Sequence, residues 1–205
     1  MSGDGKYLNR PLFFIFGMEI LTKTEFRLRL DEFLEKISNG AVFIYPTDTI
    51  YGIGCNALNK RSVARIRELK RRETNPFSVW APSKEWIKDN CILDKDGKEA
   101  VDLLPGPLTL VLELKKKISI ADNVALGIKT LGVRIPNHWF SKVVEQLGIP
   151  LVTTSANKMG RKFMTSVEDL DPDIKEDVKF MIYEGPKEGR PSKIINLVEG
   201  VVKER

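Results

Sequence analysis

The chain has few of the side chains that build disulfide frameworks, metal centres and hydrolytic triads. Among its 205 residues there are two cysteines and one histidine. Cys55 and Cys91 are too few to staple a chain of this length, and they match no metal-ligand spacing. The single histidine, His138, has no Ser/His/Asp set around it, which argues against acyl hydrolysis through a triad. We expect a reduced, cytoplasmic setting.

Long hydrophobic runs are also missing. The most apolar N-terminal stretch, residues 11–20, contains Gly17 and runs into Glu19. A membrane-spanning helix needs about 20 apolar residues, so this stretch is too short. No small-residue cleavage pattern follows it, which argues against a secretion signal. We expect a strand or a packed N-terminal segment here, and no association with a membrane.

Neither of the two familiar glycine-rich phosphate loops, G-x-x-x-x-G-K-[ST] and G-x-G-x-x-G, occurs in the sequence. The composition is that of a globular protein, with 42% hydrophobic and 30% charged residues. A formal net charge of +5 predicts a positive face that attracts an anion. Nucleic acid, nucleotide and phosphate all remain open as that anion, and a nucleotide would be held without either loop.

Helical and strand patterns alternate along the chain. Thr22 and Glu25 form a capping-box signature, and apolar residues then recur at helical spacing until Asn39 and Gly40. Further helices are expected at residues 62–72, near 86, near 101, at 139–147 and from 165 onwards, and strands at 41–45, 77–81, 108–114, 131–135, 150–154, 179–183, 193–198 and 201–203. This interleaving predicts one α/β domain built on a mixed sheet.

Four polar segments lie where a strand ends or a helix begins, which is where sites form in such sheets. They are residues 45–54, 70–76, 129–136 and 151–157. The first and the last also fit ordinary capped turns. The second is either a phosphate clamp or a solvated helix C-terminus, where cations are favoured by the helix dipole. The third places Arg134 in an apolar strand, so Arg134 needs an anion, either a ligand carboxylate or a structural Asp or Glu.

With these residues the chain resembles the YrdC-type threonylcarbamoyl-AMP synthase family from about Thr24 to its C-terminus. The matching strings are PTDTIYG (46–52), KRR (70–72) with NP (75–76), PGPLT (105–109), VRIPNH (133–138), TSAN (154–157) and PSKIIN (191–196). The resemblance implies a twisted mixed sheet flanked by helices, with a large concave positive cleft. It also implies a YrdC-like domain at residues 24–205, in the short single-domain form, preceded by an N-terminal extension at residues 1–23.

The resemblance further implies a nucleotidyltransferase that converts L-threonine, bicarbonate and ATP into threonylcarbamoyl-adenylate and pyrophosphate. Mg²⁺ would come with the ATP, with no metal held by the protein alone. A partner transferase complex would then modify tRNA, and the chain itself could contact that RNA. Carried over by position, the ATP-binding residues are Lys70, Arg72, Asn75, Thr130, Ser155 and Asn157, with Lys70 and Arg72 catalytic, and the threonine-binding residues are Thr49, Arg134, Thr153 and Ser192.

The chain departs from the family pattern at Trp80, where many members have a histidine, and at Lys193, where threonine is usual. The histidine is a threonine contact in those members, so that contact is in question here. An alternative reading is an RNA-binding module that uses a basic cleft without catalysis. Carbamoyl transfer, as in longer hydrogenase-maturation proteins with a similar domain, is a third reading that ranks well behind, because their Cys-rich regions are absent from this sequence.

Overall fold

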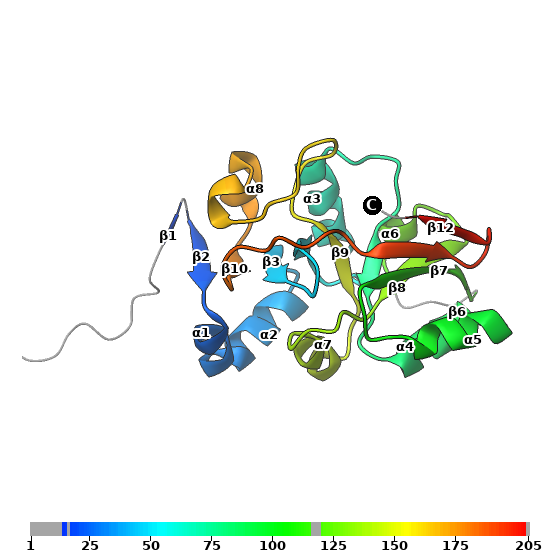
Figure 1. Cartoon of the computed structure of the whole chain (residues 1–205). Coiled ribbons are helices and arrows are strands. Elements are labelled where there is room, and N and C mark those ends of the chain that lie inside the picture. The colour runs from blue at the N-terminus through cyan, green and yellow to red at the C-terminus, as the bar shows by residue number, and fades with distance from the viewer. Residues whose placement is uncertain (1–13, 16, 116–119, 204–205) are drawn as a thin grey trace, which may run out of the picture.

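A computed structural model describes residues 14–15, 17–115 and 120–203, and within them one mixed sheet runs through the whole molecule (Figure 1). Its order is β1-β2-β10-β3-β4-β9-β5-β8-β7-β11-β12, and β6 pairs with β7 beside this path. The strands are β1 (Phe14–Ile15), β2 (Met18–Leu21), β3 (Phe43–Pro46), β4 (Tyr51–Gly54), β5 (Ser78–Trp80), β6 (Cys91–Ile92), β7 (Leu108–Leu114), β8 (Thr130–Arg134), β9 (Leu151–Ser155), β10 (Phe180–Ile182), β11 (Lys193–Asn196) and β12 (Val201–Lys203).

Helices cover both faces of the sheet, so the expected single α/β domain with a mixed, helix-flanked sheet is confirmed. The helices are α1 (Lys23–Leu28), α2 (Leu30–Ser38), α3 (Lys60–Lys70), α4 (Lys84–Asn90), α5 (Lys95–Asp102), α6 (Asp122–Ala125), α7 (Ser141–Leu147) and α8 (Pro172–Asp177), with one 3₁₀ turn, η1 (Val167–Asp169). Among the described residues, none of these helices combines the length and the apolar character that a bilayer crossing requires.

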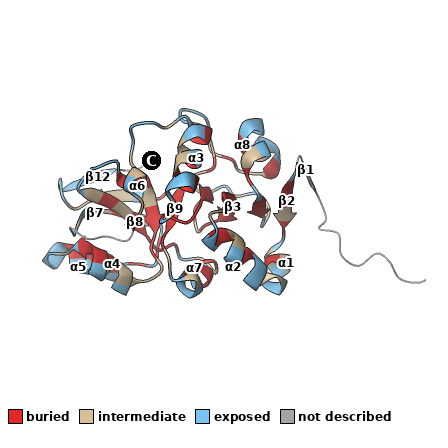
Figure 2. Ribbon diagram, turned by 180° about the vertical axis from the view of Figure 1, so that it is seen from behind, coloured by how far each residue is buried: buried red, intermediate tan, exposed pale blue. Residues whose placement is uncertain are grey.

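Two hydrophobic clusters hold the helices against the sheet. An aromatic cluster under α1, α2 and α7 includes Phe26, Phe33, Phe43, Tyr45, Trp80, Phe140 and Phe180. A mainly aliphatic cluster under α3, α5 and α8 includes Val63, Ile66, Val101 and Ile174. Figure 1 shows α3 and α8 on one side of the strands and α1, α2 and α7 on the other. Seen from behind, the buried residues follow the strands and the inner helix faces (Figure 2).

The N-terminal strand β2 belongs to the sheet. It pairs in parallel with β10, with Glu19 opposite Phe180, and Met18 is fully buried in the core. Residues 18–21 were expected in an N-terminal extension ending at residue 23. That boundary does not separate the extension from the sheet, because β2 forms one of the inner strands next to β10.

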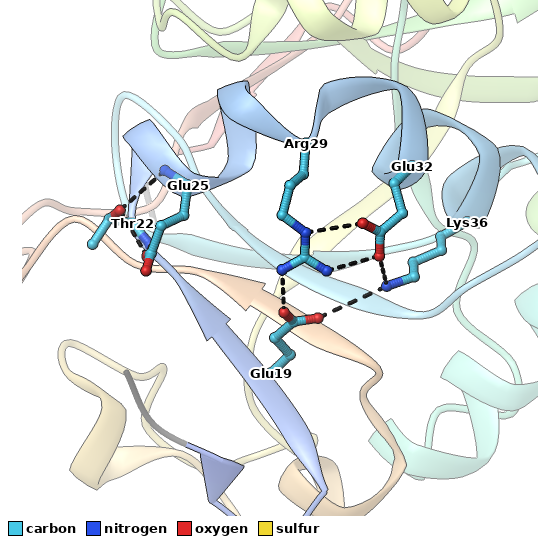
Figure 3. A network of polar contacts seen from close by, with 6 residues as sticks. All are labelled: Glu19, Thr22, Glu25, Arg29, Glu32 and Lys36. Carbon is cyan, nitrogen blue, oxygen red and sulfur yellow. Dashed lines mark hydrogen bonds and ion pairs between the residues drawn. The ribbon is translucent and has the colours of Figure 1, made fainter. Parts of the chain in front are cut away.

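The helix expected from Thr22 to residue 38 is two helices. The capping box of Thr22 and Glu25 is present, as expected. At Arg29, however, the backbone leaves helical geometry, with φ −117° and ψ 29°. The Arg29 guanidinium there bonds both Glu32 and the buried Glu19 of β2, with its Nη1 2.5 Å from Glu19 Oε1 (Figure 3). The break thus fastens the first helices to strand β2.

The prediction of a helix from residue 165 onwards is wrong. The capping box there joins Ser166 and Asp169, and it closes only the 3₁₀ turn η1. Helix α8 starts afresh at Pro172, with Asp171 as its N-cap. Proline fits the first position of a helix because it has no N–H to donate, so Pro172 begins a new helix and does not continue the turn. The short elements β4, β6 and α6 were not expected from the sequence.

Candidate functional site

A cavity of about 140 Å³ lies over the middle of the sheet. Its floor is set by strand register. Ser78 of β5 lies opposite Thr153 of β9 and beside Gly132 of β8, while Gly52 of β4 lies opposite Ser155. Since side chains alternate along a strand, Ser78 is on the same face as Trp80, and the cavity continues the face that carries the aromatic cluster. Its polar lining consists of Thr47, Ser78, Thr109, Arg134, Thr153, Thr154, Ser155 and Ser192.

Arg134, at the end of β8, contributes the charge in this lining. It is 7% exposed, and its Nη2 lies 2.9 Å from Oδ1 of Asp48. The other carboxylate oxygen of Asp48 accepts the backbone N–H of Asn137 at 2.9 Å. The structure thus supplies the anion that Arg134 needs, and it is a structural carboxylate. Because Arg134 also lines the cavity, the ion pair fixes the guanidinium at the cavity wall.

The loop between β3 and β4 is shaped by Thr47. Its hydroxyl donates to the Ile50 carbonyl oxygen at 2.7 Å and accepts the backbone N–H groups of Thr49 and Ile50. The Thr49 hydroxyl lies 3.0 Å from that of Thr47. Thr49 is therefore buried behind Thr47, and the residue that lines the cavity is Thr47. The capped turn considered for residues 45–54 is present and forms one wall of the site.

Lys70, the last residue of α3, meets the end of β9. Its ammonium donates to the carbonyl oxygens of Ser155 and Asn157, both at 2.5 Å, and to Asn157 Oδ1 at 3.2 Å. The Ser155 hydroxyl also donates to Asn157 Oδ1 at 2.5 Å. Burial, reinforced by the neighbouring Arg72 guanidinium, lowers the pKa of Lys70 to about 7. Lys70 is 3% exposed, which excludes a solvated helix end at this position.

Arg72 is folded back onto the loop that follows α3. Its guanidinium donates to the carbonyl oxygens of Pro76 at 2.5 Å and Asn75 at 3.3 Å, and it lies 3.5 Å from the Thr154 hydroxyl. It also stacks over the Phe77 ring, 5.0 Å from the centroid. Asn75 itself is exposed. Arg72 thus reaches the cavity rim through Thr154.

The expected site residues are brought together in part. Arg134, Thr153, Ser155 and Ser192 line the cavity, Lys70 and Asn157 bond to Ser155, Thr49 lies behind Thr47, and Arg72 reaches Thr154. Asn75 and Thr130 are not in the cavity lining. Thr130 starts β8, opposite Glu113, at the other end of the strand from Arg134.

Residues 183–192, which connect β10 to β11, run beside the cavity and contribute Pro191 and Ser192 to its lining; in Figure 1 this orange segment crosses in front of β9. The Tyr51 hydroxyl holds it by donating to the Gly185 carbonyl oxygen and accepting the Glu184 N–H. Gly189 lies so close that a Cβ there would be 2.0 Å from the Thr49 carbonyl oxygen, so only glycine fits. Ser192 then bonds to Thr109 at 2.8 Å.

Sequence reasoning missed Thr47, Ser78 and Thr109 as lining residues. Thr47 and Thr109 stand inside strings that carried the family resemblance, so a signal for them existed. Ser78 stands in no such string, and only its alternation with Trp80 in a short strand pointed to this face.

Comparison with known proteins points to the family that the sequence resembles. The Sua5/YciO/YrdC family model, described as telomere recombination, matches residues 35–204. The chain belongs to this family. A Methanocaldococcus jannaschii relative, which carries a provisional threonylcarbamoyl-AMP synthase name, is 39% identical over 191 residues, covering 87% of this chain and 89% of its own. The resemblance found from the sequence is thereby confirmed.

Longer Sua5/YciO/YrdC proteins match over part of their length. The threonylcarbamoyl-AMP synthase of Pyrococcus abyssi is 33% identical over 171 residues, which is 80% of this chain and 49% of that protein. The crystal structure of P. abyssi Sua5 complexed with L-threonine superposes with a TM-score of 0.75 at 28% identity, covering 89% of this chain and 55% of that one. The chain spans about half the length of this relative.

Proposed function

We propose that this chain is a threonylcarbamoyl-AMP synthase, which forms threonylcarbamoyl-adenylate and pyrophosphate from L-threonine, bicarbonate and ATP. The observation that carries the proposal is a buried guanidinium, Arg134, at the wall of a small cavity lined by hydroxyl groups. One of these hydroxyl groups belongs to Ser155, whose carbonyl oxygen accepts a hydrogen bond from Lys70. Family membership supports it, because relatives over most of this chain carry this activity in their names.

The cavity suits an amino acid. Drug-sized ligands occupy pockets of about 300–1,000 Å³, whereas this cavity measures about 140 Å³. Arg134 would bind the threonine carboxylate, and the hydroxyl groups of Thr153 and Ser192 would lie around the rest of the molecule. Thr49 would act through Thr47, its hydrogen-bonded neighbour.

ATP would lie outside the cavity, where α3 meets the end of β9. Lys70, Arg72, Ser155 and Asn157 are the groups we assign to it, and Asn75 and Thr130 would have to be reached by the rest of the nucleotide. In this proposal, the same region forms the concave positive cleft expected for the family. Mg²⁺ would arrive on the phosphates, since the side chains gathered here are cations and hydroxyls suited to phosphate oxygens. Bound there, it would neutralise phosphate charge.

The chemistry requires positioning more than covalent catalysis. The threonine amine and bicarbonate give a carbamate with loss of water. A carbamate oxygen then forms a bond to the α-phosphorus of ATP, and the bond from that phosphorus to the pyrophosphate oxygen breaks. Lys70 and Arg72 would stabilise the charge that develops on the departing pyrophosphate. A transferase complex would use the adenylate to modify tRNA.

The test is to incubate the purified protein with ATP, Mg²⁺, L-threonine and labelled bicarbonate, and to follow pyrophosphate and the labelled adenylate. We expect both products, in equal amounts, only when threonine is present. Adenylate that forms equally well without threonine contradicts the proposal. Absence of adenylate together with salt-sensitive RNA binding would support the alternative RNA-binding module.

A further inference from the structure

The hydroxyl groups of the cavity differ in whether the protein itself engages them. The Thr47 hydroxyl bonds within its own loop, and those of Thr109 and Ser192 bond to each other. The Ser155 hydroxyl donates to Asn157, and the Thr154 hydroxyl lies at Arg72. The Thr153 hydroxyl interacts with the buried Tyr45. Among the described residues, the Ser78 hydroxyl alone of this set makes no side-chain hydrogen bond.

Ser78 lies at the floor of the cavity. On β5 it is flanked by Thr153 on one side and Gly132 on the other. A Cβ added to Gly132 would be 2.4 Å from Ser78 Oγ and 3.4 Å from Thr109 Cγ2. The Ser78 hydroxyl therefore leans over Gly132, in space that any other residue at that position would fill. The glycine keeps the hydroxyl accessible from the cavity.

Ser78 and Arg134 line the same small cavity from neighbouring strands. Ser78 pairs with Gly132, and Arg134 follows two positions later on the same face of β8. Because the cavity measures about 140 Å³, a small ligand that fills it is in reach of both side chains. An amino acid with its carboxylate at Arg134 would therefore have its side chain in the space that Ser78 borders.

Trp80 does not compete for this role. Its indole is fully buried and lies outside the cavity lining, packed edge-on against Tyr45 and Phe140. Ser78 is the residue of β5 whose side chain enters the cavity.

We propose that the Ser78 hydroxyl hydrogen-bonds the side-chain hydroxyl of the amino-acid substrate, which makes Ser78 a specificity-determining residue for β-hydroxy amino acids. The inference rests on the proposed function. A site that offers a hydrogen bond to a substrate hydroxyl rejects the analogue without it, because its own polar group is then left unpaired. 2-Aminobutyrate, which has hydrogen in place of the threonine hydroxyl, is the matched analogue.

The experiment measures binding of L-threonine and of 2-aminobutyrate by calorimetry, with circular dichroism of each variant as a check on folding. The unchanged protein should prefer threonine by roughly tenfold or more. In Ser78→Ala the preference should fall below about threefold, through weaker threonine binding with 2-aminobutyrate unchanged. Ser78→Cys, which keeps the side-chain size, should behave in the same way, so a folding defect of one variant leaves the other to decide.

Thr109→Val is the matched control, since its hydroxyl already bonds Ser192. It should affect both ligands alike and leave the preference unchanged. If both Ser78 variants keep the full preference for threonine, this inference is overturned while the proposed function stands. If the unchanged protein does not bind threonine at all, the proposed function fails and takes the inference with it.

Discussion

The two cationic regions beside the sheet are built in opposite ways. Arg134 is held by the carboxylate of Asp48 and the cavity beside it is already open. Lys70 instead donates to carbonyl oxygens at the end of β9, and Arg72 donates to a carbonyl oxygen of its own loop. The proposed amino-acid side of the site is thus formed in advance, whereas the cations of the proposed nucleotide side already bond to carbonyl oxygens of the protein itself. Phosphate oxygens must replace those carbonyl contacts, so binding of ATP should require local rearrangement and binding of threonine should not.

The largest expected effect comes from removing Arg134, the cation of the pre-formed cavity. Arg134→Ala should weaken threonine binding by at least about 100-fold, because the carboxylate loses a buried guanidinium. It should also lower the free energy of unfolding by about 3 kcal/mol, because the Asp48 carboxylate loses its cation and keeps only the backbone N–H of Asn137. Calorimetry and chemical denaturation measure the two effects.

The double variant Asp48→Asn/Arg134→Ala separates these two effects. It should recover most of the stability, since no uncompensated charge remains buried. Threonine binding should stay lost. Recovery of threonine binding in the double variant would mean that Arg134 is structural only.

The second-largest effect concerns the proposed nucleotide side, where Lys70 bonds to carbonyl oxygens of the protein. The pKa of Lys70 lies near 7, lowered by burial, so its charged form is present below that pH and is lost as the pH rises. Phosphates favour the charged form, so ATP binding at pH 8 should take up about one proton, and ATP affinity should fall by up to about tenfold per pH unit above 7. Calorimetry in buffers of different ionisation enthalpy measures the uptake.

Lys70→Arg is the control for this linkage. Its guanidinium stays charged throughout, so proton uptake should vanish. Equal uptake in Lys70→Arg and the unchanged protein would assign the proton to another group. Threonine binding, measured in the same buffers, should show no such uptake.

The third effect is steric. Gly132→Ala would place a methyl group 2.4 Å from Ser78 Oγ, at the cavity floor. The methyl group would fill space that the proposed ligand needs, so the KM for threonine should rise roughly tenfold while the KM for ATP is unchanged, and the overpacking should also cost about 1–3 kcal/mol of stability. Gly106→Ala is matched to it, since its Cβ would meet only the Leu103 carbonyl oxygen at 3.6 Å. If both KM values rise together, the cavity is not a separate amino-acid site.

The smallest effect lies away from both regions. Arg29→Ala removes the bond to the buried Glu19 and should lower the free energy of unfolding by about 1–2 kcal/mol, with both substrate affinities unchanged. Lys95→Ala, whose partner Glu99 is 4.0 Å away on the exposed face of α5, should change stability by less than about 0.5 kcal/mol. A loss of threonine binding in Arg29→Ala would mean that strand β2 is coupled to the site.

Local signals in the sequence predicted the regular elements well. The strands at 108–114 and 201–203 have the expected bounds, and the helix capped by Thr22 begins where its capping box predicts. The break at Arg29 could not be predicted from local patterns, because it depends on the position of Glu19. That position is set by the pairing of β2 with β10, a strand far away in the sequence. The helix expected from residue 165 failed because one turn satisfied its own capping box before Pro172 began α8.

The site was predictable where a motif marked it and not where register decided it. An anionic partner for Arg134 followed from its burial in an apolar strand, but Asp48 stands 86 positions away and only the fold selects it. Ser78 was missed because its orientation depends on pairing with β8 and β9, which no local pattern encodes. The sequence also could not show that Lys70 is turned inward to β9.

The pairing of β2 with β10 and the packing of residues 183–192 beside the cavity have a consequence for how the protein is made. Strand β2 completes its pairing only with a strand that is synthesised much later, after β3 to β9. A chain that has emerged from the ribosome only through β9 therefore lacks β10, the parallel partner of β2, and also lacks Pro191 and Ser192 of the cavity lining. Contacts of such long sequence separation slow folding, so a nascent chain should form this cavity only after residues 180–192 have left the ribosome.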